Sequence, residues 1–253
     1  MLMRNISFSL LIISSPSWGA EITSSLTTGM DYSTGKYGGT TSTNILYLPV
    51  TGKIYIDDMF LKLTVPYISI TSAGSTVIKG IGPINTPVSG SKTTTESGLG
   101  DVIASAGYTT FESDSLTLDL AAIIKFGTAD ERKNLGTGEN DYSVQMDGYY
   151  MLNKTTLFAT AGYTVIGAPT GFTLNNIIYG SIGASQEIDE TRVVGIVLGA
   201  AQSSSANIPG TKELSVYFSN KFSQNLQVQV NLLKGYSESS PDLGGSLMLT
   251  GTY

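Results

Sequence analysis

Apolar and polar residues alternate in short runs along most of the chain. In the clearest run, residues 116–126, Leu118, Leu120 and Ile124 share one phase, and Thr117, Asp119 and Lys125 share the other. Successive side chains of a β-strand point to opposite faces, so this pattern predicts a strand with one apolar face. Strong runs also cover 59–67, 142–150, 157–165, 226–232 and 247–253, and weaker ones cover 22–32, 41–55, 99–111, 177–186, 192–202 and 212–221.

The gaps between these runs are alternately short and long. The short gaps are 56–58, 112–115, 153–154, 187–190 and 223–225, and the long ones are 33–40, 72–98, 128–140, 166–176, 203–211 and 235–243. Bacterial outer-membrane barrels have an even number of strands, short periplasmic turns and longer extracellular loops. We therefore predict an all-β fold, a transmembrane antiparallel up-and-down β-barrel of about twelve strands. A soluble β-sandwich is the alternative, and it rarely shows such regular alternation.

The two ends of the chain are consistent with export to an outer membrane. Residues 1–19 combine Arg4, an apolar run over 8–13, the helix breaker Pro16 and small residues before Ala20, which predicts a secretory signal peptide followed by a barrel over 20–253. The last run alternates and ends on Tyr253. This is typical of the segment that the barrel assembly machinery recognises, and we expect it to pair with 22–32 and close the sheet.

Aromatic residues fall near the predicted strand ends, where a membrane-spanning barrel carries its aromatic girdles. Six lie at predicted outer ends: Tyr32, Tyr67, Phe126, Tyr142, Tyr163 and Tyr236. Five lie at predicted inner ends: Tyr55, Phe111, Tyr150, Phe222 and Tyr253.

Composition narrows the possible functions. The chain has no cysteine and no histidine, so it has no thiolate metal ligand, no disulfide and no imidazole base. Ser237, Ser239, Ser240 and Asp242 therefore form no hydrolytic triad. The formal charge is −6 without a basic cluster, which argues against nucleic acid as a partner. We predict neither an enzyme nor a cofactor.

Polar residues on the second phase of the strands are the candidates for the barrel interior. A charge that faces lipid at mid-depth costs about 2–4 kcal/mol, so we expect these side chains to face inward. They are Lys62, Asp119, Lys125, Gln145, Asp147, Gln227, Gln229 and Asn231. Their mixed signs would favour no single class of ion in an open pore. Alternatively, they pair with each other and fill a closed interior; a narrow, partly occluded pore is the favoured prediction.

Two segments between strands carry further candidates. The long gap 72–98 is rich in Gly and Pro and shows no periodicity, so we expect a structureless loop. It either folds inward as a constriction, with Ile78, Ile81 and Ile84 as apolar contacts, or extends outside. In the second segment, the carboxylates of Asp130, Glu131, Glu139 and Asp141 have the right chemistry for a calcium site, but Arg132 and Lys133 favour mutual ion pairing instead.

Several pieces of the chain resemble a known family of outer-membrane proteins, named for a MetA-pathway of phenol degradation. The matching pieces are TGMDYSTGKYG, LTVPYISIT, GLGDV, KFGTADERKNLGTGENDY, GYTVIG and GYSESSPDLGG, in the order of the family. Two positions depart from the family pattern: Gly127 replaces an expected Pro, and Met59-Phe60 replaces a frequent Trp. The resemblance implies an outer-membrane barrel that moves small, often aromatic or hydrophobic compounds.

Together these patterns predict an outer-membrane channel of a Gram-negative bacterium, exported by its signal peptide and embedded in outer-membrane lipid. It would pass small organic solutes by passive transport. The alternative is a closed barrel with a structural or recognition role through its extracellular loops.

Overall fold

The computed structural model describes residues 22–37, 41–73, 75–79, 82–86, 93–205 and 208–253. Most of these residues lie in β-strands. The strands are β1 (Ile22–Gly35), β2 (Thr43–Ile56), β3 (Met59–Ala73), β4 (Ser75–Lys79), β5 (Gly82–Thr86), β6 (Thr93–Leu99), β7 (Val102–Glu112), β8 (Leu116–Phe126), β9 (Asp141–Leu152), β10 (Thr155–Val165), β11 (Ile177–Glu187), β12 (Arg192–Ala201), β13 (Thr211–Ser223), β14 (Leu226–Gly235) and β15 (Leu243–Thr252).

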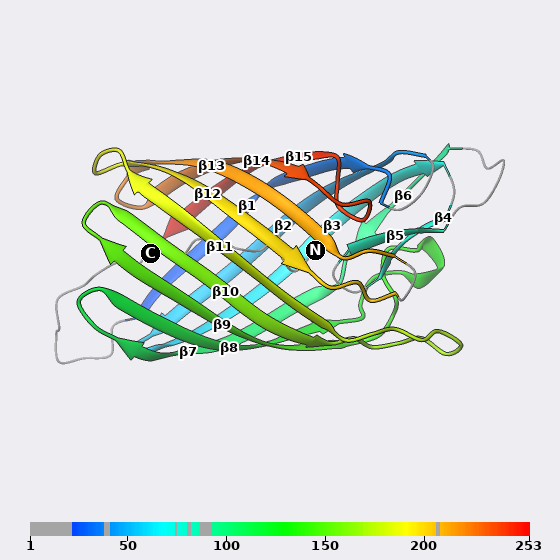
Figure 1. The fold of residues 1–253 in the computed structure, drawn as a ribbon, viewed down its shortest axis with the longest axis horizontal. Helices are drawn as coiled ribbons and strands as arrows, with labels where there is room; N and C mark the ends of the chain where they lie inside the picture. Colours follow the sequence, from blue (N-terminus) through cyan, green and yellow to red (C-terminus); the bar gives the residue numbers. More distant parts are fainter. Residues whose placement is uncertain (1–21, 38–40, 74, 80–81, 87–92, 206–207) are drawn as a thin grey trace.

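The main sheet closes on itself as an antiparallel barrel (Figure 1). Strands β7 to β15 pair in sequence order, and so do β1, β2 and β3. β1 also pairs with β15, which removes the free edges. β6 and β7 occupy one position because both pair with β3. The barrel therefore has twelve strand positions: β1, β2, β3, β6 with β7, and β8 to β15. The predicted fold class and the predicted pairing of the last strand with the first are confirmed.

The two faces of the strands differ in chemistry, as the alternation predicts. On β3, Leu61 and Leu63 are each 50% exposed on the outer face, whereas Thr64 and Ile68 are buried on the inner face. The same division runs around the barrel, so a band of large apolar side chains covers the outside. Ten of the eleven predicted girdle aromatics are exposed, and Tyr55 is the exception because it lies on the inward phase of β2.

One irregularity interrupts the wall between β6 and β7. Tyr67 pairs with Leu99, and Thr64 pairs with Ile103, so three steps along β3 face four steps along the other chain segment. The extra residue is a β-bulge at Gly100–Asp101, where the Gly100 N–H donates to the Pro66 carbonyl at 2.9 Å. The bulge changes the phase of the alternation and turns the Asp101 side chain inward.

Tight turns gather at one end of the barrel and longer connections at the other, which we name the turn end and the loop end (Figure 1). Asp57 and Asn153, in two of the tight turns, have φ values of 51° and 54°, as hairpin turns of this length require. The prediction of a structureless loop over 72–98 is wrong. β3 runs to Ala73, β4 and β5 form a separate hairpin, and β6 returns to the barrel, because backbone pairing forms these strands without an alternating pattern.

Among the described residues, no helix is long and apolar enough to cross a membrane. The predicted signal peptide, residues 1–19, lies outside them.

Candidate functional site

The barrel interior holds all eight side chains that the sequence assigns to the inward phase. Lys62 lies between the lipid-facing Leu61 and Leu63 on β3, and Asn231 lies between Val230 and Leu232 on β14. The eight form three groups: Lys62, Asp119 and Asp147 in the turn-end half with Gln145 near the middle of β9, Lys125 at the loop end, and Gln227, Gln229 and Asn231 on β14. That they line a solute path is a proposal taken up below.

Four charged side chains form a group that we name the charged belt: Lys53, Lys62, Asp119 and Asp147. Lys53 on β2 lies directly opposite Lys62 on β3. Asp119 on β8 lies directly opposite Asp147 on β9. The belt therefore consists of one pair of lysines and one pair of aspartates, on two parts of the same wall.

Neutral donors hold the two carboxylates of the belt. The Thr109 hydroxyl donates to Asp119 at 2.8 Å. The Thr160 hydroxyl donates to Asp147 at 2.6 Å, and the Gln145 amide donates to its other oxygen at 2.7 Å. Gln145 in turn accepts a hydrogen bond from the Tyr179 hydroxyl at 2.9 Å. These bonds fix the carboxylates without neutralising their charge.

Aromatic rings lie beside the lysines of the belt. The Lys53 ammonium is 4.1 Å from the centre of the Tyr55 ring and 4.3 Å from the centre of the Phe60 ring. The two ring centres are 6.2 Å apart. A cation over an aromatic face is attracted by the ring's quadrupole, so the rings orient the Lys53 side chain.

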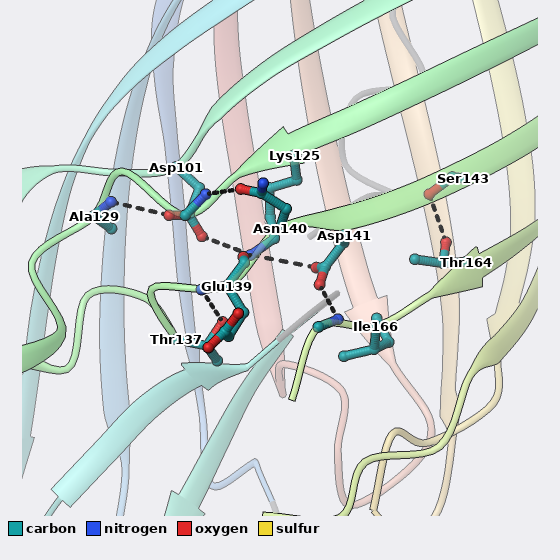
Figure 2. Close-up of polar contacts among 12 residues, drawn as sticks. Asp101, Lys125, Ala129, Thr137, Glu139, Asn140, Asp141, Ser143, Thr164 and Ile166 are labelled. Carbon is teal, nitrogen blue, oxygen red and sulfur yellow. Dashed lines mark hydrogen bonds and ion pairs between the residues drawn. The ribbon is translucent and has the colours of Figure 1, made fainter. Parts of the chain in front are cut away.

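A second charged group, the loop-end anchor, consists of Asp101, Lys125 and Asp141 (Figure 2). The Lys125 ammonium is 2.8 Å from the Asp101 carboxylate and 3.3 Å from that of Asp141. It also donates to the Glu139 carbonyl at 3.2 Å. All three side chains are less than a tenth exposed. The ammonium is thus enclosed by oxygen acceptors.

The loop-end anchor joins three connections of the barrel (Figure 2). Asp101 belongs to the β-bulge, and its second oxygen accepts from the Ala129 N–H at 3.0 Å. Asp141 accepts from the Gly167 N–H, after β10, at 2.9 Å. Lys125 and Asp141 flank the β8–β9 loop, residues 127–140. The anchor therefore fixes this loop to both of its neighbours.

The β8–β9 loop folds into the loop end of the barrel. Leu135 is only 2% exposed, in a buried apolar cluster with inward-facing residues of β2 and β3. The full cluster is Tyr37, Ile45, Tyr47, Ile68, Ile70, Ala129 and Leu135. The loop therefore occupies part of the interior and narrows the mouth from this side.

Local turn geometry shapes the same loop. A single 3-10 turn, Glu131–Lys133, has Asp130 at its N-terminus, where the carboxylate accepts from the Arg132 N–H. Desolvation alone would raise the pKa of Asp130, but the hydrogen bonds from Arg132 and its charge hold that pKa below the ordinary value. Asn134 and Gly138 have φ values of 56° and 71°, in the left-handed region.

The four carboxylates considered for calcium do not converge. Asp130 and Glu131 lie in the 3-10 turn, Asp141 contacts Lys125, and Glu139 contacts Lys125 through its backbone oxygen. Within the part of the chain that the structure describes, no three acidic, histidine or cysteine side chains are placed to hold a metal ion.

One of the three predicted constriction residues lies outside the part of the chain that the structure describes. Ile81 lies outside the described residues. Ile78 pairs through its backbone with Pro83, and Ile84 pairs with Val77, in the β4–β5 hairpin. Their role as a constriction stays a prediction.

A second apolar cluster also lies at the loop end, on β11, β12 and the loop before β11, whereas the first cluster involves β2 and β3. It consists of Ile166, Ile177, Tyr179 and Ala201, with Leu174 packed against them. Inward positions at this end are therefore largely apolar on β2, β3, β11 and β12, whereas the turn-end half holds the charged belt.

Sequence reasoning missed three residues of these groups, namely Lys53, Asp101 and Leu135. Lys53 lies on the same phase as Tyr47 and Thr51, so its inward position was accessible from the alternation of β2. The roles of Asp101 and Leu135 depend on the bulge and on the path of the loop, which no local periodicity records.

Comparisons with known proteins agree with this architecture. The model of a family described as "Putative MetA-pathway of phenol degradation" matches residues 19–250. A search among curated proteins finds no match.

Solved structures with the same fold include an outer membrane channel, a porin and a translocator domain. An outer membrane channel from Pseudomonas putida F1 is 14% identical, with a TM-score of 0.73 over 96% of this chain and 99% of that one. The KdgM porin is 9% identical, with a TM-score of 0.58 over 90% and 99%. The translocator domain of autotransporter NalP from Neisseria meningitidis is 11% identical, with a TM-score of 0.53 over 92% and 88%. At these identities, the likeness concerns the fold alone.

Proposed function

Because the chain belongs to the family of the MetA-pathway of phenol degradation, we propose that it is a passive outer-membrane channel for small organic solutes. Aromatic or otherwise hydrophobic compounds are the favoured class. The observation that carries this proposal is the contrast between the apolar, aromatic clusters at the loop end of β2, β3, β11 and β12 and the charged belt in the turn-end half. Sites for organic ligands combine apolar walls with a few placed polar groups.

The solute path that we propose runs from the loop end to the turn end. Solutes would meet the apolar clusters first and then the lining that we assign to Lys62, Asp119, Gln145, Asp147, Gln227, Gln229 and Asn231. Lys125, the eighth predicted lining residue, is enclosed in the loop-end anchor and would not contact the solute. Such a path needs binding strong enough for entry and weak enough for release, which partial apolar contact provides. No step of this function requires catalysis.

The orientation that we propose places the turn end in the periplasm and the loop end outside, as in other bacterial barrels. The exposed apolar band would face outer-membrane lipid, and the strand that ends before Tyr253 would engage the barrel assembly machinery. The likeness to the Pseudomonas putida channel supports an outer-membrane location.

The alternative is a closed barrel that acts through its loops. The loop-end anchor favours this reading, because it holds the β8–β9 loop inside the mouth. In that case the interior polar side chains would pair with each other and fill the closed barrel, and the exposed loops would bind a partner.

Flux measurements decide between the two functions. We expect the refolded barrel to give single-channel conductance in planar bilayers and to let small polyols swell liposomes. Empty liposomes and liposomes with heat-unfolded protein provide the blanks. Absence of conductance and swelling, in a preparation whose gel mobility shifts on heating as folded barrels do, would contradict the channel and favour the closed barrel.

A further inference from the structure

The charged belt groups its charges by sign. Lys53 and Lys62 are direct cross-strand neighbours, and so are Asp119 and Asp147. Like charges directly opposite each other on a sheet destabilise it, whereas opposite charges contribute roughly 0.2–1 kcal/mol. An arrangement with alternating signs would be more stable, so fold stability does not explain this grouping.

The two halves of the belt remain apart. Among the described residues, Lys62, Asp119 and Asp147 make no ion pair within 4 Å. Lys125 in the same barrel contacts two carboxylates, so ion pairing is available to an inward lysine of this protein. The separation in the belt is therefore local and specific.

β7 lies between the two halves of the belt. Strands β3 and β8 both pair with β7, so they are two strand spacings apart, on the order of 10 Å. The inward residue of β7 opposite Phe60 is Gly107, and the Phe60 ring fills the space where a Cβ would stand. An aromatic surface thus lies between the lysines and the aspartates.

We propose that the charged belt is a binding site for net-neutral, dipolar solutes, above all small aromatic zwitterions. The anionic group of the solute lies toward Lys53 and Lys62, its cationic group lies toward Asp119 and Asp147, and its ring lies against Phe60. This site rests on the proposed channel function, because the solute must enter the barrel.

The sign pattern explains the selectivity. A zwitterion gains attraction at both halves of the belt, whereas a simple ion is attracted by one half and repelled by the other. The inward residues of β14, Gln227, Gln229 and Asn231, are uncharged and add no competing charge. The belt therefore favours dipoles over ions of either sign.

Uptake into proteoliposomes tests this site, with labelled L-phenylalanine as the zwitterion and sorbitol as the uncharged reference. We expect the wild-type barrel to take up phenylalanine faster than sorbitol by about two- to fivefold, after subtraction of protein-free liposomes. Lys62→Gln and Asp119→Asn should each lower this ratio toward one, and sorbitol uptake by the same vesicles corrects for the amount of inserted barrel.

The matched controls are Lys154→Gln and Asp114→Asn, which change the net charge equally but lie in exposed turns. Both should keep the wild-type ratio. If one belt variant fails to fold, the other carries the test. Equal uptake of both solutes, or a ratio that the belt variants do not change, would overturn the zwitterion site and leave the channel intact. Absence of all uptake by a folded barrel would overturn both.

Discussion

Two charged groups inside the same barrel have opposite designs. In the loop-end anchor, Lys125 lies between two carboxylates at 2.8 and 3.3 Å, and the group is closed to solvent. In the charged belt, Lys62 lies beside Lys53, and the aspartates are held by hydroxyl and amide groups. The first arrangement brings opposite charges into contact, and the second keeps the two signs apart.

The difference separates a structural role from an interaction role. A buried group of paired charges is shielded from a solute, but it fixes the segments that supply it. A group of separated charges contributes little to the fold and leaves an electric field in the interior. Substitutions should therefore affect stability at the anchor and selectivity at the belt.

The largest expected effect comes from Lys125→Met. It leaves Asp101 and Asp141 buried without their cation, a change that typically costs about 3–5 kcal/mol. We expect a lower free energy of unfolding in urea and faster tryptic cleavage after Arg132 and Lys133. Lys154→Met, in an exposed turn, is the control. Unchanged unfolding and cleavage would show that the anchor does not hold the loop.

Leu135→Ala tests the apolar half of the same attachment. Leu135 is almost fully buried, and truncation of a buried leucine typically costs about 2–5 kcal/mol. Because the loss falls on the docked loop, tryptic cleavage at Arg132 should accelerate more than global unfolding does. Leu152→Ala, on an exposed side chain near the turn end, should leave cleavage unchanged. Faster global unfolding without faster tryptic cleavage at Arg132 would show that Leu135 does not hold the loop in place.

Gly107→Ala tests the packing of the Phe60 ring against β7. A Cβ at this position would collide with the Phe60 ring, and overpacking typically costs about 1–3 kcal/mol. Phe60→Leu in the same chain should recover part of the loss. Gly52→Ala is the matched control, since nothing lies within 4 Å of its added Cβ. Equal urea midpoints for the two glycine variants would disprove this contact.

Lys62→Gln should have little effect on stability, with a change below about 1 kcal/mol, because it removes a like-charge neighbour rather than an ion pair. The effect should appear in ion selectivity instead. In a bilayer with a KCl gradient, the reversal potential should shift toward cation preference. A large loss of stability with unchanged selectivity would reverse the roles that we assign to anchor and belt.

The smallest effect concerns an ion pair outside the barrel wall. In the β11–β12 turn, hydrogen bonds from Arg192, and then from Thr191, hold the pKa of Asp189 far below its ordinary value. A lowered pKa contributes stability above the unfolded value of about 4 and loses it as the pH falls toward the folded value. Asp189→Asn should therefore unfold slightly more easily near pH 7, with a difference that shrinks in acid. A pH-independent difference would contradict this origin.

The sequence predicts the barrel far better than it predicts the mouth. Residues 116–126 are found as β8 with the predicted limits, because lipid on one side and a polar interior on the other impose strict alternation. The β4–β5 hairpin escaped prediction because it lies outside the barrel sheet, free of that constraint. The burial of Leu135 also escaped, since it depends on contacts between segments far apart in the chain.

The charged belt could be predicted from the sequence only in part. Alternation places Lys62, Asp119 and Asp147 inward, but it gives no information on which of them are neighbours. That information lies in the register, which pairs Asp119 with Asp147 and Lys53 with Lys62. The tight turn at residues 57–58 sets the register of β2 and β3, whereas β8 and β9 are joined by the long loop 127–140, whose length does not fix their register.

The β-bulge at Gly100–Asp101 makes the fold sensitive to the loss of a single residue at this point of the chain. One additional residue in this strand position shifts the phase of everything beyond it and also supplies the carboxylate that contacts Lys125. Deletion of the codon for Asp101 would turn the inside of β6 outward and remove one of the two carboxylates at a buried ammonium in the same event. A shorter segment at this point of the chain would therefore leave Lys125, on another strand, with a single carboxylate partner.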